Sequence, residues 1–277
     1  MGTSTADHFA APDSPGSTTT SALMLTGERT VPGIPEENYW FRRHEAAYKF
    51  LFPQVANLKT VEVGCGEGYG SAMLARSASQ LVAFDYDTIA VSHAGRRYGA
   101  SDDNADAQVP CFVQGNLAAL PVRSGSVDVV VSLQVVEHVW DHAQYVRECA
   151  RILRPGGTLF LSTPNRLTFS PGADPTAPPT NPFHTYEFTG TELVGLLSAC
   201  DLPQVRTYGL FAGETLVRMN QRHRPSFVDA QLSTAPAHWS TQLRHDVEQI
   251  TVNDFVIREA SGSDLDECLD LLVRVSL

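Results

Sequence analysis

The chain has 277 residues, 43% of them hydrophobic, and its 20 basic and 31 acidic side chains give a formal net charge of −11. This length and composition suit one domain with an insertion. The acidity, without a basic stripe, argues against a nucleic-acid partner, and no apolar segment reaches the length of a membrane span.

The first residues and the cysteines indicate a cytoplasmic protein. Residues 1–22 are rich in Ser, Thr, Ala, Pro and Gly, and no lysine or arginine precedes Arg29. A signal peptide needs a basic start and an apolar middle, so we expect a disordered tail here. The five cysteines are widely spaced without a C-x-x-C pair, as in proteins that keep their thiols reduced.

From residue 23 to residue 162, helical and strand patterns alternate. Residues 23–57 form an N-terminal arm with a helix over 36–52, and the main domain, residues 58–277, follows. The apolar run at 127–133 is typical of a strand covered on both faces. Strands that alternate with helices predict a parallel, doubly wound α/β sheet. We expect strands at 60–63, 80–84, 109–114, 127–133 and 158–162, and helices at 71–77, 89–98 and 143–153.

After residue 162 the pattern changes. A proline-containing loop spans residues 164–190, and loops of this length in a compact domain are usually functional. A helix at 192–200 and a strand at 205–211 precede an insertion, residues 212–250, that we expect to be helical in part. Residues 255–257 and 269–275 suit closing strands. We favour 269–275 as the seventh strand, although 265–275 also fits a helix.

The first predicted strand ends in glycines at alternate positions, Gly64, Gly66 and Gly68, with Glu62 ahead of them. Such glycines allow a tight turn from strand to helix whose backbone N–H groups approach a ligand. A dinucleotide site requires G-x-G-x-x-G, with glycine where this chain has Tyr69. The acidic-x-G-x-G-x-G pattern instead resembles motif I of the class I S-adenosylmethionine-dependent methyltransferases.

This resemblance implies a Rossmann-like fold with a seven-stranded sheet in the order 3-2-1-4-5-7-6, an N-terminal helical arm that closes over the cofactor S-adenosylmethionine, and an insertion after strand 6. Asp85 is expected to bind the ribose hydroxyls of the cofactor, and Asn116 its adenine amine. Arg43 is expected to bind the cofactor carboxylate, or else to be an exposed helix cation. The expected cofactor contacts are Glu62, Gly64, Cys65, Gly66, Asp85, Tyr86, Asn116, Leu117, Gln134 and Arg43.

Residues 134–138 and 181–189 resemble two groups of O-methyltransferases, one that makes quinones and one that methylates the 2′-hydroxyl of small RNAs. The second group places a divalent cation on a Glu-x-x-Glu-His segment and a later histidine. Carried over by position, the ligands of Mg²⁺ or Mn²⁺ are Gln134, Glu137, His138 and His184, with Gln134 in place of a carboxylate. Without a metal, His138 would act as a general base oriented by Glu137, and His184 would be a turn residue. The candidate catalytic residues are Glu137, His138 and His184.

The arm, from Leu25 to His44, narrows the choice of the acceptor substrate. Together with residues 65–70, 85–87, 181–184 and 227–231, it resembles mycobacterial-type sugar O-methyltransferases of methylmannose polysaccharide synthesis. The resemblance implies an oligosaccharide partner, methylated at the reducing-end 1-hydroxyl of a short α-1,4-linked mannoside. Because sugar sites combine aromatic faces with polar groups, the candidate substrate-binding residues are Trp40, Phe169, Phe183 and Tyr186.

Two other functions stay open. One is methylation of a quinone or another phenolic small molecule, because phenols ionise more easily and depend less on a cation. The other is a non-catalytic subunit that binds S-adenosylmethionine, against which the intact Glu137, His138 and His184 argue. The sequence leaves the oligomeric state open, and a homodimer is compatible with it.

Overall fold

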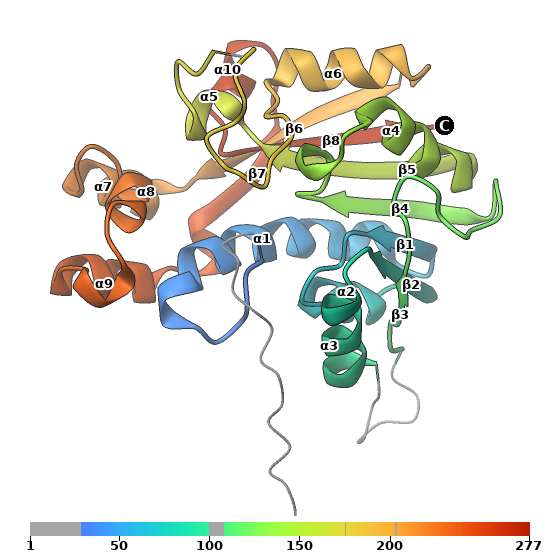
Figure 1. Cartoon of the computed structure of the whole chain (residues 1–277), viewed down its shortest axis with the longest axis horizontal. Coiled ribbons are helices and arrows are strands. Elements are labelled where there is room, and N and C mark those ends of the chain that lie inside the picture. The colour runs from blue at the N-terminus through green and yellow to red at the C-terminus, as the bar shows by residue number, and fades with distance from the viewer. Residues whose placement is uncertain (1–28, 100–107, 175, 203) are drawn as a thin grey trace, which may run out of the picture.

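The computed structural model describes residues 29–99, 108–174, 176–202 and 204–277. The predicted tail, residues 1–22, and residues 23–28 of the arm lie outside the described residues. One mixed sheet runs through the molecule, with helices on both of its faces (Figure 1). Its strands are β1 (Lys59–Val63), β2 (Gln80–Asp85), β3 (Cys111–Gln114), β4 (Val127–Leu133), β5 (Leu153–Pro164), β6 (Val205–Ala212), β7 (Phe255–Glu259) and β8 (Asp270–Ser276).

The strand order is β3-β2-β1-β4-β5-β8-β6-β7. The first five strands pair in parallel, whereas β8 is antiparallel to both β5 and β6. The predicted order 3-2-1-4-5-7-6 is therefore confirmed, with β8 as the predicted seventh strand. The helix considered for residues 265–275 is wrong, because α10 (Ser263–Asp266) ends before β8 begins.

The seven strands that the resemblance implies are one fewer than the eight of the sheet, although residues 255–257 were predicted as a closing strand. β7 pairs with β6 and extends the sheet at its edge as an eighth strand. Phe255 is buried whereas its neighbour Val256 is 44% exposed. This alternation is typical of a strand with one face on the core and one face in solvent.

The helices lie in two layers. Polar caps begin several of them: Asp141 accepts a hydrogen bond from the backbone of Gln144, and Thr189 and Glu192 form a capping box. Figure 1 shows α4 (His142–Ile152) and α6 (Gly190–Ala199) on one face of the sheet, and α1 (Asn38–Leu51), α2 (Tyr69–Ala75) and α3 (Thr88–Tyr98) on the other.

The helix of the predicted arm, α1, packs as part of the core. Its buried residues include Tyr39, Arg43, Ala47 and Leu51, which recur every four positions and form one face. Tyr39 belongs to a cluster that joins α1 to the predicted insertion. The insertion contains α7 (Glu214–Arg222), α8 (Phe227–Leu232) and α9 (Thr241–Gln249). Closure of the arm over a cofactor stays a prediction.

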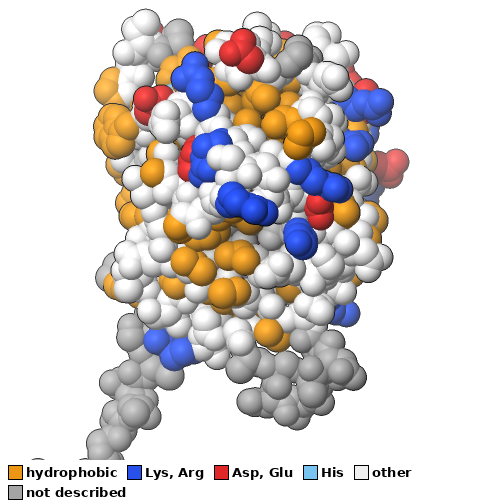
Figure 2. Space-filling model, turned by 90° about the vertical axis from the view of Figure 1, so that its right-hand side faces the viewer, with side chains coloured by type: hydrophobic (Ala, Val, Ile, Leu, Met, Phe, Trp, Pro, Cys, Tyr) orange, Lys and Arg blue, Asp and Glu red, His pale blue; other side chains and the backbone are white. Residues whose placement is uncertain are grey.

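Figure 2 shows the face at the right-hand side of Figure 1, where β5 begins. Lys and Arg side chains on this face are separated by other atoms and form no continuous stripe in the described part of the chain. Arg151 and Arg154, close to this end of β5, pair with Glu148 and Asp128 at 2.7 and 2.6 Å. The exclusion of a nucleic-acid partner stays a prediction. No helix among the described residues is long and apolar enough to cross a membrane.

Candidate active site

The glycine turn after β1 lies directly against the segment that follows β4. Gly64 has a φ of 87°, and a Cβ atom at this position would lie 2.3 Å from Cγ2 of Val135. The Gly64 N–H donates to the Phe84 carbonyl at the end of β2, at 2.7 Å. Only glycine combines this backbone conformation with such a close approach. The turn therefore joins the carboxyl ends of three neighbouring strands, where open α/β sheets bind ligands.

Glu62 supports the glycine turn from behind. Its carboxylate accepts hydrogen bonds from the Tyr48 hydroxyl of α1, at 2.7 Å, and from the Ser71 hydroxyl of α2. The side chain is buried, and burial raises the pKa of Glu62 to about 7. Cys65 is buried as well, and burial raises the pKa of its thiol. In this structure Glu62 orients the turn instead of facing outward.

Asp85 connects β2 to the glycine turn. Its carboxylate accepts hydrogen bonds from the backbone N–H groups of Gly66, at 2.9 Å, and Asp87, at 3.0 Å. Arg29 lies over the turn, with its guanidinium 2.9 Å from Asp87 and 4.0 Å from Asp85. Tyr86 is 70% exposed beside them. These groups leave the end of β2 polar, with one aromatic face in solvent.

Arg29 did not emerge from the sequence. The one available signal is that it is the first cation of the chain, and no periodic pattern links it to Asp85.

The backbone carbonyl of Asp85 accepts a hydrogen bond from the Gly115 N–H at 2.9 Å. This bond places Asn116 close to the end of β2, with its side-chain oxygen accepting from the Ala118 N–H and Leu117 buried behind it.

Arg43 forms a buried ion pair with Asp270 at the start of β8. Its guanidinium donates to both carboxylate oxygens and lies 4.3 Å from the centre of the Phe169 ring. The side chain is 4% exposed, so the predicted alternative of an exposed helix cation is wrong. Because Asp270 occupies the guanidinium, the predicted contact with a cofactor carboxylate has no support in these contacts.

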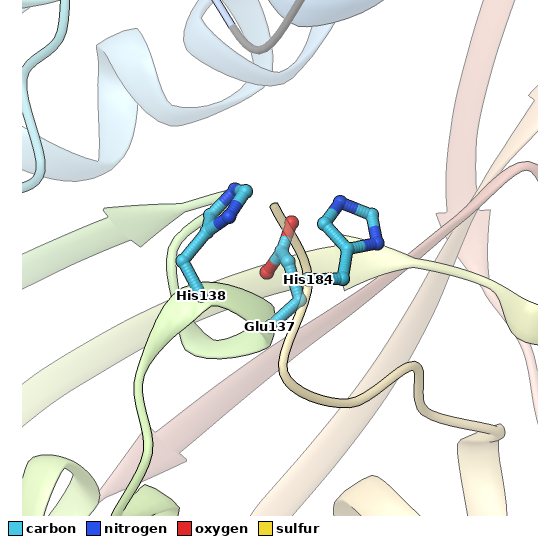
Figure 3. A group of neighbouring side chains, drawn as sticks. All are labelled: Glu137, His138 and His184. Atoms are coloured by element: carbon cyan, nitrogen blue, oxygen red, sulfur yellow. The ribbon is translucent and has the colours of Figure 1, made fainter. Parts of the chain in front are cut away.

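Glu137, His138 and His184 come together at the carboxyl end of β4 (Figure 3). The first two follow β4 on the short 3₁₀ helix η3 (Val136–His138), and His184 comes from the loop before α6. One potential ligand atom of each residue lies within 4.8 Å of the others. The structure thus brings together three of the four residues that the resemblance implies as metal ligands, and their role as ligands stays a prediction.

Glu137 is the buried member of this group. Its side chain is 1% exposed, and Oε2 has no hydrogen-bond partner among the described residues. Burial raises the pKa of Glu137, while the neighbouring His138 and His184 lower it. An unpartnered carboxylate oxygen in the interior is costly, which is the condition expected where a further group binds.

The histidines are fixed through both segments. Nδ1 of His138 lies 3.0 Å from the carbonyl oxygen of Phe183, and Nδ1 of His184 lies 3.1 Å from the Glu187 carboxylate. The two imidazole rings meet edge to face, with their centres 5.0 Å apart. The Glu137 carbonyl accepts from the Thr185 N–H at 2.7 Å, so the loop is bonded to η3 as well.

Gln134, the fourth predicted metal ligand, turns toward β5 and β8. Its φ is 56°, and its amide nitrogen lies 3.1 Å from Ser162 Oγ and 3.3 Å from Asp270 Oδ1. A non-glycine residue in this conformation is strained, and such strain concentrates at functional sites. The amide here orients the end of β4, and its role as a ligand stays a prediction.

The four candidate aromatic residues divide into two pairs. Trp40 and Phe169 lie 6.2 Å apart around Arg43. Phe183 is 49% exposed next to His138. Tyr186 donates to Glu192 at 3.0 Å and packs on Phe188. Among the four candidates, Phe183 is therefore the one whose side chain is most exposed.

Comparison with known proteins identifies the family. A protein of Mycolicibacterium smegmatis named "probable S-adenosylmethionine-dependent methyltransferase" is 46% identical over 254 residues, which cover 91% of this chain and 94% of that protein. This chain belongs to the S-adenosylmethionine-dependent methyltransferases. A protein of Mycobacterium tuberculosis with a corresponding name is 46% identical over 266 residues, 94% of this chain and 93% of its own length.

The same family is visible at the level of domain and fold. A model of the family described as a methyltransferase domain matches residues 61–161 of this methyltransferase, which run from β1 into β5. The crystal structure of a methyltransferase from Thermotoga maritima superposes with a TM-score of 0.55 at 16% identity and covers 87% of this chain and 94% of that one. At this identity the likeness concerns the fold alone.

The geometry separates two parts of the methyltransferase site. The glycine turn and Asp85 form the side where the sequence predicts S-adenosylmethionine, which stays a prediction, and η3 with the loop before α6 forms the opposite side. The contact between Gly64 and Val135 brings the two sides together. Methyl transfer from a sulfonium is an in-line displacement that depends on alignment of the reacting groups, and this contact fixes the spacing between the two candidate parts of the site.

Proposed function

We propose that this methyltransferase transfers the methyl group of S-adenosylmethionine to a sugar hydroxyl, the reducing-end 1-hydroxyl of a short α-1,4-linked mannoside. The observation that carries the proposal is the group of Glu137, His138 and His184 beside the glycine turn. A hydroxyl is a poor nucleophile and has to lose its proton, so it needs a base or a metal ion at the acceptor. An amine acceptor would need neither.

We further propose that a divalent cation, Mg²⁺ or Mn²⁺, assists the transfer. The residues fit such an ion, because the buried Oε2 of Glu137 lacks a partner among the described residues and two imidazoles lie within reach of it. Mixed oxygen and nitrogen donors suit these ions. When bound, a divalent cation lowers the pKa of a hydroxyl by Lewis-acid chemistry. Glu137, His138 and His184 would hold it.

The residues of the chain itself orient the acceptor. Glu137 is fixed by burial and by its backbone bond to Thr185, and it faces the two imidazoles. If no cation binds, His138 is the base within this group, because its ring is held by the Phe183 carbonyl. In both cases the acceptor hydroxyl loses its proton on the side of η3 while the methyl group approaches from the glycine turn.

The choice of a sugar rests on the sequence resemblance of the arm and on the surroundings of the histidines. A neutral oligosaccharide requires no cationic pocket, and Arg43, the buried cation of the arm, is neutralised by Asp270. Phe183 offers a partly exposed ring next to the histidines, while Trp40, Phe169 and Tyr186 are the other aromatic candidates. A cytoplasmic location and a homodimer stay predictions.

The test is mass spectrometry of acceptors incubated with the full chain and S-adenosylmethionine. Short α-1,4-linked mannosides with a free 1-hydroxyl are compared with the same mannosides blocked at that position, and with a catechol. We expect a gain of one methyl group for the free mannosides alone, lost on chelation and restored by Mg²⁺ or Mn²⁺.

Each other outcome selects an alternative. Transfer to the catechol alone would favour the phenolic acceptor. Transfer to mannosides that survives chelation but is lost in His138→Ala would favour the metal-free base. Binding of S-adenosylmethionine without transfer to any acceptor would leave the non-catalytic subunit as the better description.

A further inference from the structure

His138 and His184 share one tautomer. A backbone carbonyl only accepts hydrogen bonds, so the 3.0 Å contact between the Phe183 carbonyl oxygen and Nδ1 of His138 places the proton of this ring on Nδ1. The lone pair of His138 therefore lies on Nε2. The carbonyl oxygen that selects this tautomer belongs to the loop before α6, whereas His138 itself belongs to η3.

Two contacts assign the same tautomer to His184. The Glu187 carboxylate accepts from Nδ1 at 3.1 Å, and the Asn181 amide nitrogen, which only donates, lies 3.1 Å from Nε2. Figure 3 shows the nitrogen next to the side-chain stem, Nδ1, on the side away from Glu137 and His138, and the other nitrogen, Nε2, at the upper edge of the ring. Nε2 of His184 thus carries the lone pair of the ring, which accepts from Asn181 in this structure; a cation held by the group would take the place of this donor.

Glu187 is built to hold this orientation. It is 8% exposed, and its backbone carbonyl accepts from Arg166 at 2.9 Å. The next residue, Phe188, forms a bridge with Asn165 at the end of β5. A carboxylate oxygen of Glu187 lies 3.1 Å from Nδ1 of His184, within hydrogen-bond distance. Sequence reasoning assigned no role to this residue.

We propose that Glu187 is a positioning residue that keeps His184 protonated on Nδ1 and directs Nε2 at Glu137. Loss of this contact would let the ring rotate or change tautomer and would weaken any divalent cation held by the group. Removal of an oxygen that orients a ligating histidine commonly costs 10- to 100-fold in metal affinity. The metal part of this inference rests on the proposed function, whereas the tautomer does not.

The first experiment measures the tautomer in the metal-free full chain. Nitrogen NMR of the imidazoles, with His184 identified by comparison with His184→Gln, should show Nδ1 protonated in the wild type. In Glu187→Ala, a substantial population protonated on Nε2 should appear. Glu192→Gln is the matched control, because Glu192 also bonds to Arg166, at 2.8 Å, but not to a histidine; it should leave the His184 signals unchanged.

The second experiment measures Mn²⁺ binding by electron paramagnetic resonance of the free ion. We expect Glu187→Ala to raise the Kd for Mn²⁺ by 10- to 100-fold, and Glu187→Gln, whose amide oxygen still accepts from Nδ1, to raise it less. Glu192→Gln should bind as the wild type does. Thermal unfolding and binding of S-adenosylhomocysteine establish that each variant is folded.

The two experiments separate the two proposals. If His184 of the wild type is protonated on Nε2, or if Glu187→Ala leaves both its tautomer and the Mn²⁺ affinity unchanged, the positioning role is overturned. If the tautomer responds as expected but the wild type binds no Mn²⁺, the positioning role stands and the cation of the proposed function is lost.

Discussion

The Tyr48 hydroxyl of α1 donates a 2.7 Å hydrogen bond to the Glu62 carboxylate of β1, and both side chains are buried. The ring of Tyr48 also lies on Gly70, where a Cβ atom would come within 1.9 Å of it. The arm helix and the glycine turn are therefore packed as one unit. The helix α1 therefore supports the glycine turn and is an integral part of the fold.

We first predict that Glu62 gives the protein a specific pH dependence. Burial raises its pKa to about 7, from an ordinary value of 4.5. The folded state thus binds this proton more tightly than the unfolded state, and the resulting stability is complete below pH 4.5 and lost as the pH rises toward 7. The rise in the pKa of Glu62 from 4.5 to about 7 corresponds to a loss on the order of 3 kcal/mol in the free energy of unfolding.

The measurement is urea unfolding of the wild type and Glu62→Gln at several values between pH 4.5 and 8. Glutamine does not ionise, so the free energy of unfolding of the variant should fall less over this range. At pH 8 the variant should equal or exceed the wild type. Parallel curves for the two proteins would contradict the assignment of this proton to Glu62.

A second prediction concerns Gly64. Alanine there would meet Val135 at 2.3 Å in a backbone conformation with a φ of 87°. We expect Gly64→Ala to weaken binding of S-adenosylhomocysteine by at least about tenfold, because the turn and the segment after β4 have to separate. Gly195→Ala on α6 is the control, since nothing lies within 4 Å of it. It should keep the affinity and stabilise the protein by roughly 1 kcal/mol. Titration calorimetry measures the affinity of both variants for S-adenosylhomocysteine. Equal affinities of Gly64→Ala and Gly195→Ala would refute the close contact between Gly64 and Val135.

The parts of the fold that follow from local patterns could be predicted. The alternating helices and strands indicated a parallel, doubly wound sheet, and the resemblance to methyltransferases implied the strand order. The glycines after β1 marked the turn that needs a positive φ. Glu137, His138 and His184 were found because their segments resemble a known ligand pattern. In each case the signal lies within a few neighbouring residues.

The remaining features depend on contacts between distant residues. Arg43 and Asp270 are 227 positions apart, so a helix with several charged residues gave no sign that this one is buried. The sequence does not show that Tyr48 and Ser71 donate to the carboxylate of Glu62, whose contact with the cofactor stays a prediction. β7 was predicted as a strand at residues 255–257, but the family resemblance, which implies seven strands, gave it no place in the sheet. Partners, and not propensities, decide these features.

A third prediction tests the buried ion pair. Arg43→Ala would leave Asp270 in the interior without its cation, at 4% exposure. Loss of one partner of a buried pair costs about 3–5 kcal/mol, and urea unfolding should show a loss of this size. Arg42→Ala on the same helix removes a half-exposed partner of Glu45 and should cost less than about 1 kcal/mol. Unchanged stability of Arg43→Ala with a large loss of cofactor affinity would instead favour the predicted contact with the cofactor carboxylate.

A fourth prediction assigns Asp85 to the cofactor. If its carboxylate binds the ribose hydroxyls, Asp85→Ala should weaken the binding of S-adenosylhomocysteine by about 1.5–3 kcal/mol, the range for hydrogen bonds to a charged group. Part of the effect would arise from the lost bond to the Gly66 N–H. Asp87→Ala removes the closer partner of Arg29, at 2.9 Å, and serves as the comparison. Titration calorimetry that finds both variants equal to the wild type would remove Asp85 from the pocket.

The last prediction separates donor binding from turnover. Glu137→Ala and His184→Ala each remove a member of the group beside η3 but leave the glycine turn and Asp85 intact. Binding of S-adenosylhomocysteine should stay within about twofold of the wild type, whereas the methyl-transfer rate should fall by about 100- to 10,000-fold, as expected for loss of the group that deprotonates the acceptor. His245→Ala is the matched control, because His245 is an exposed residue of α9 outside the group. Single-turnover transfer to the acceptor that the wild type methylates, measured at saturating donor, checks this; full activity in both variants would show that the acceptor hydroxyl loses its proton elsewhere.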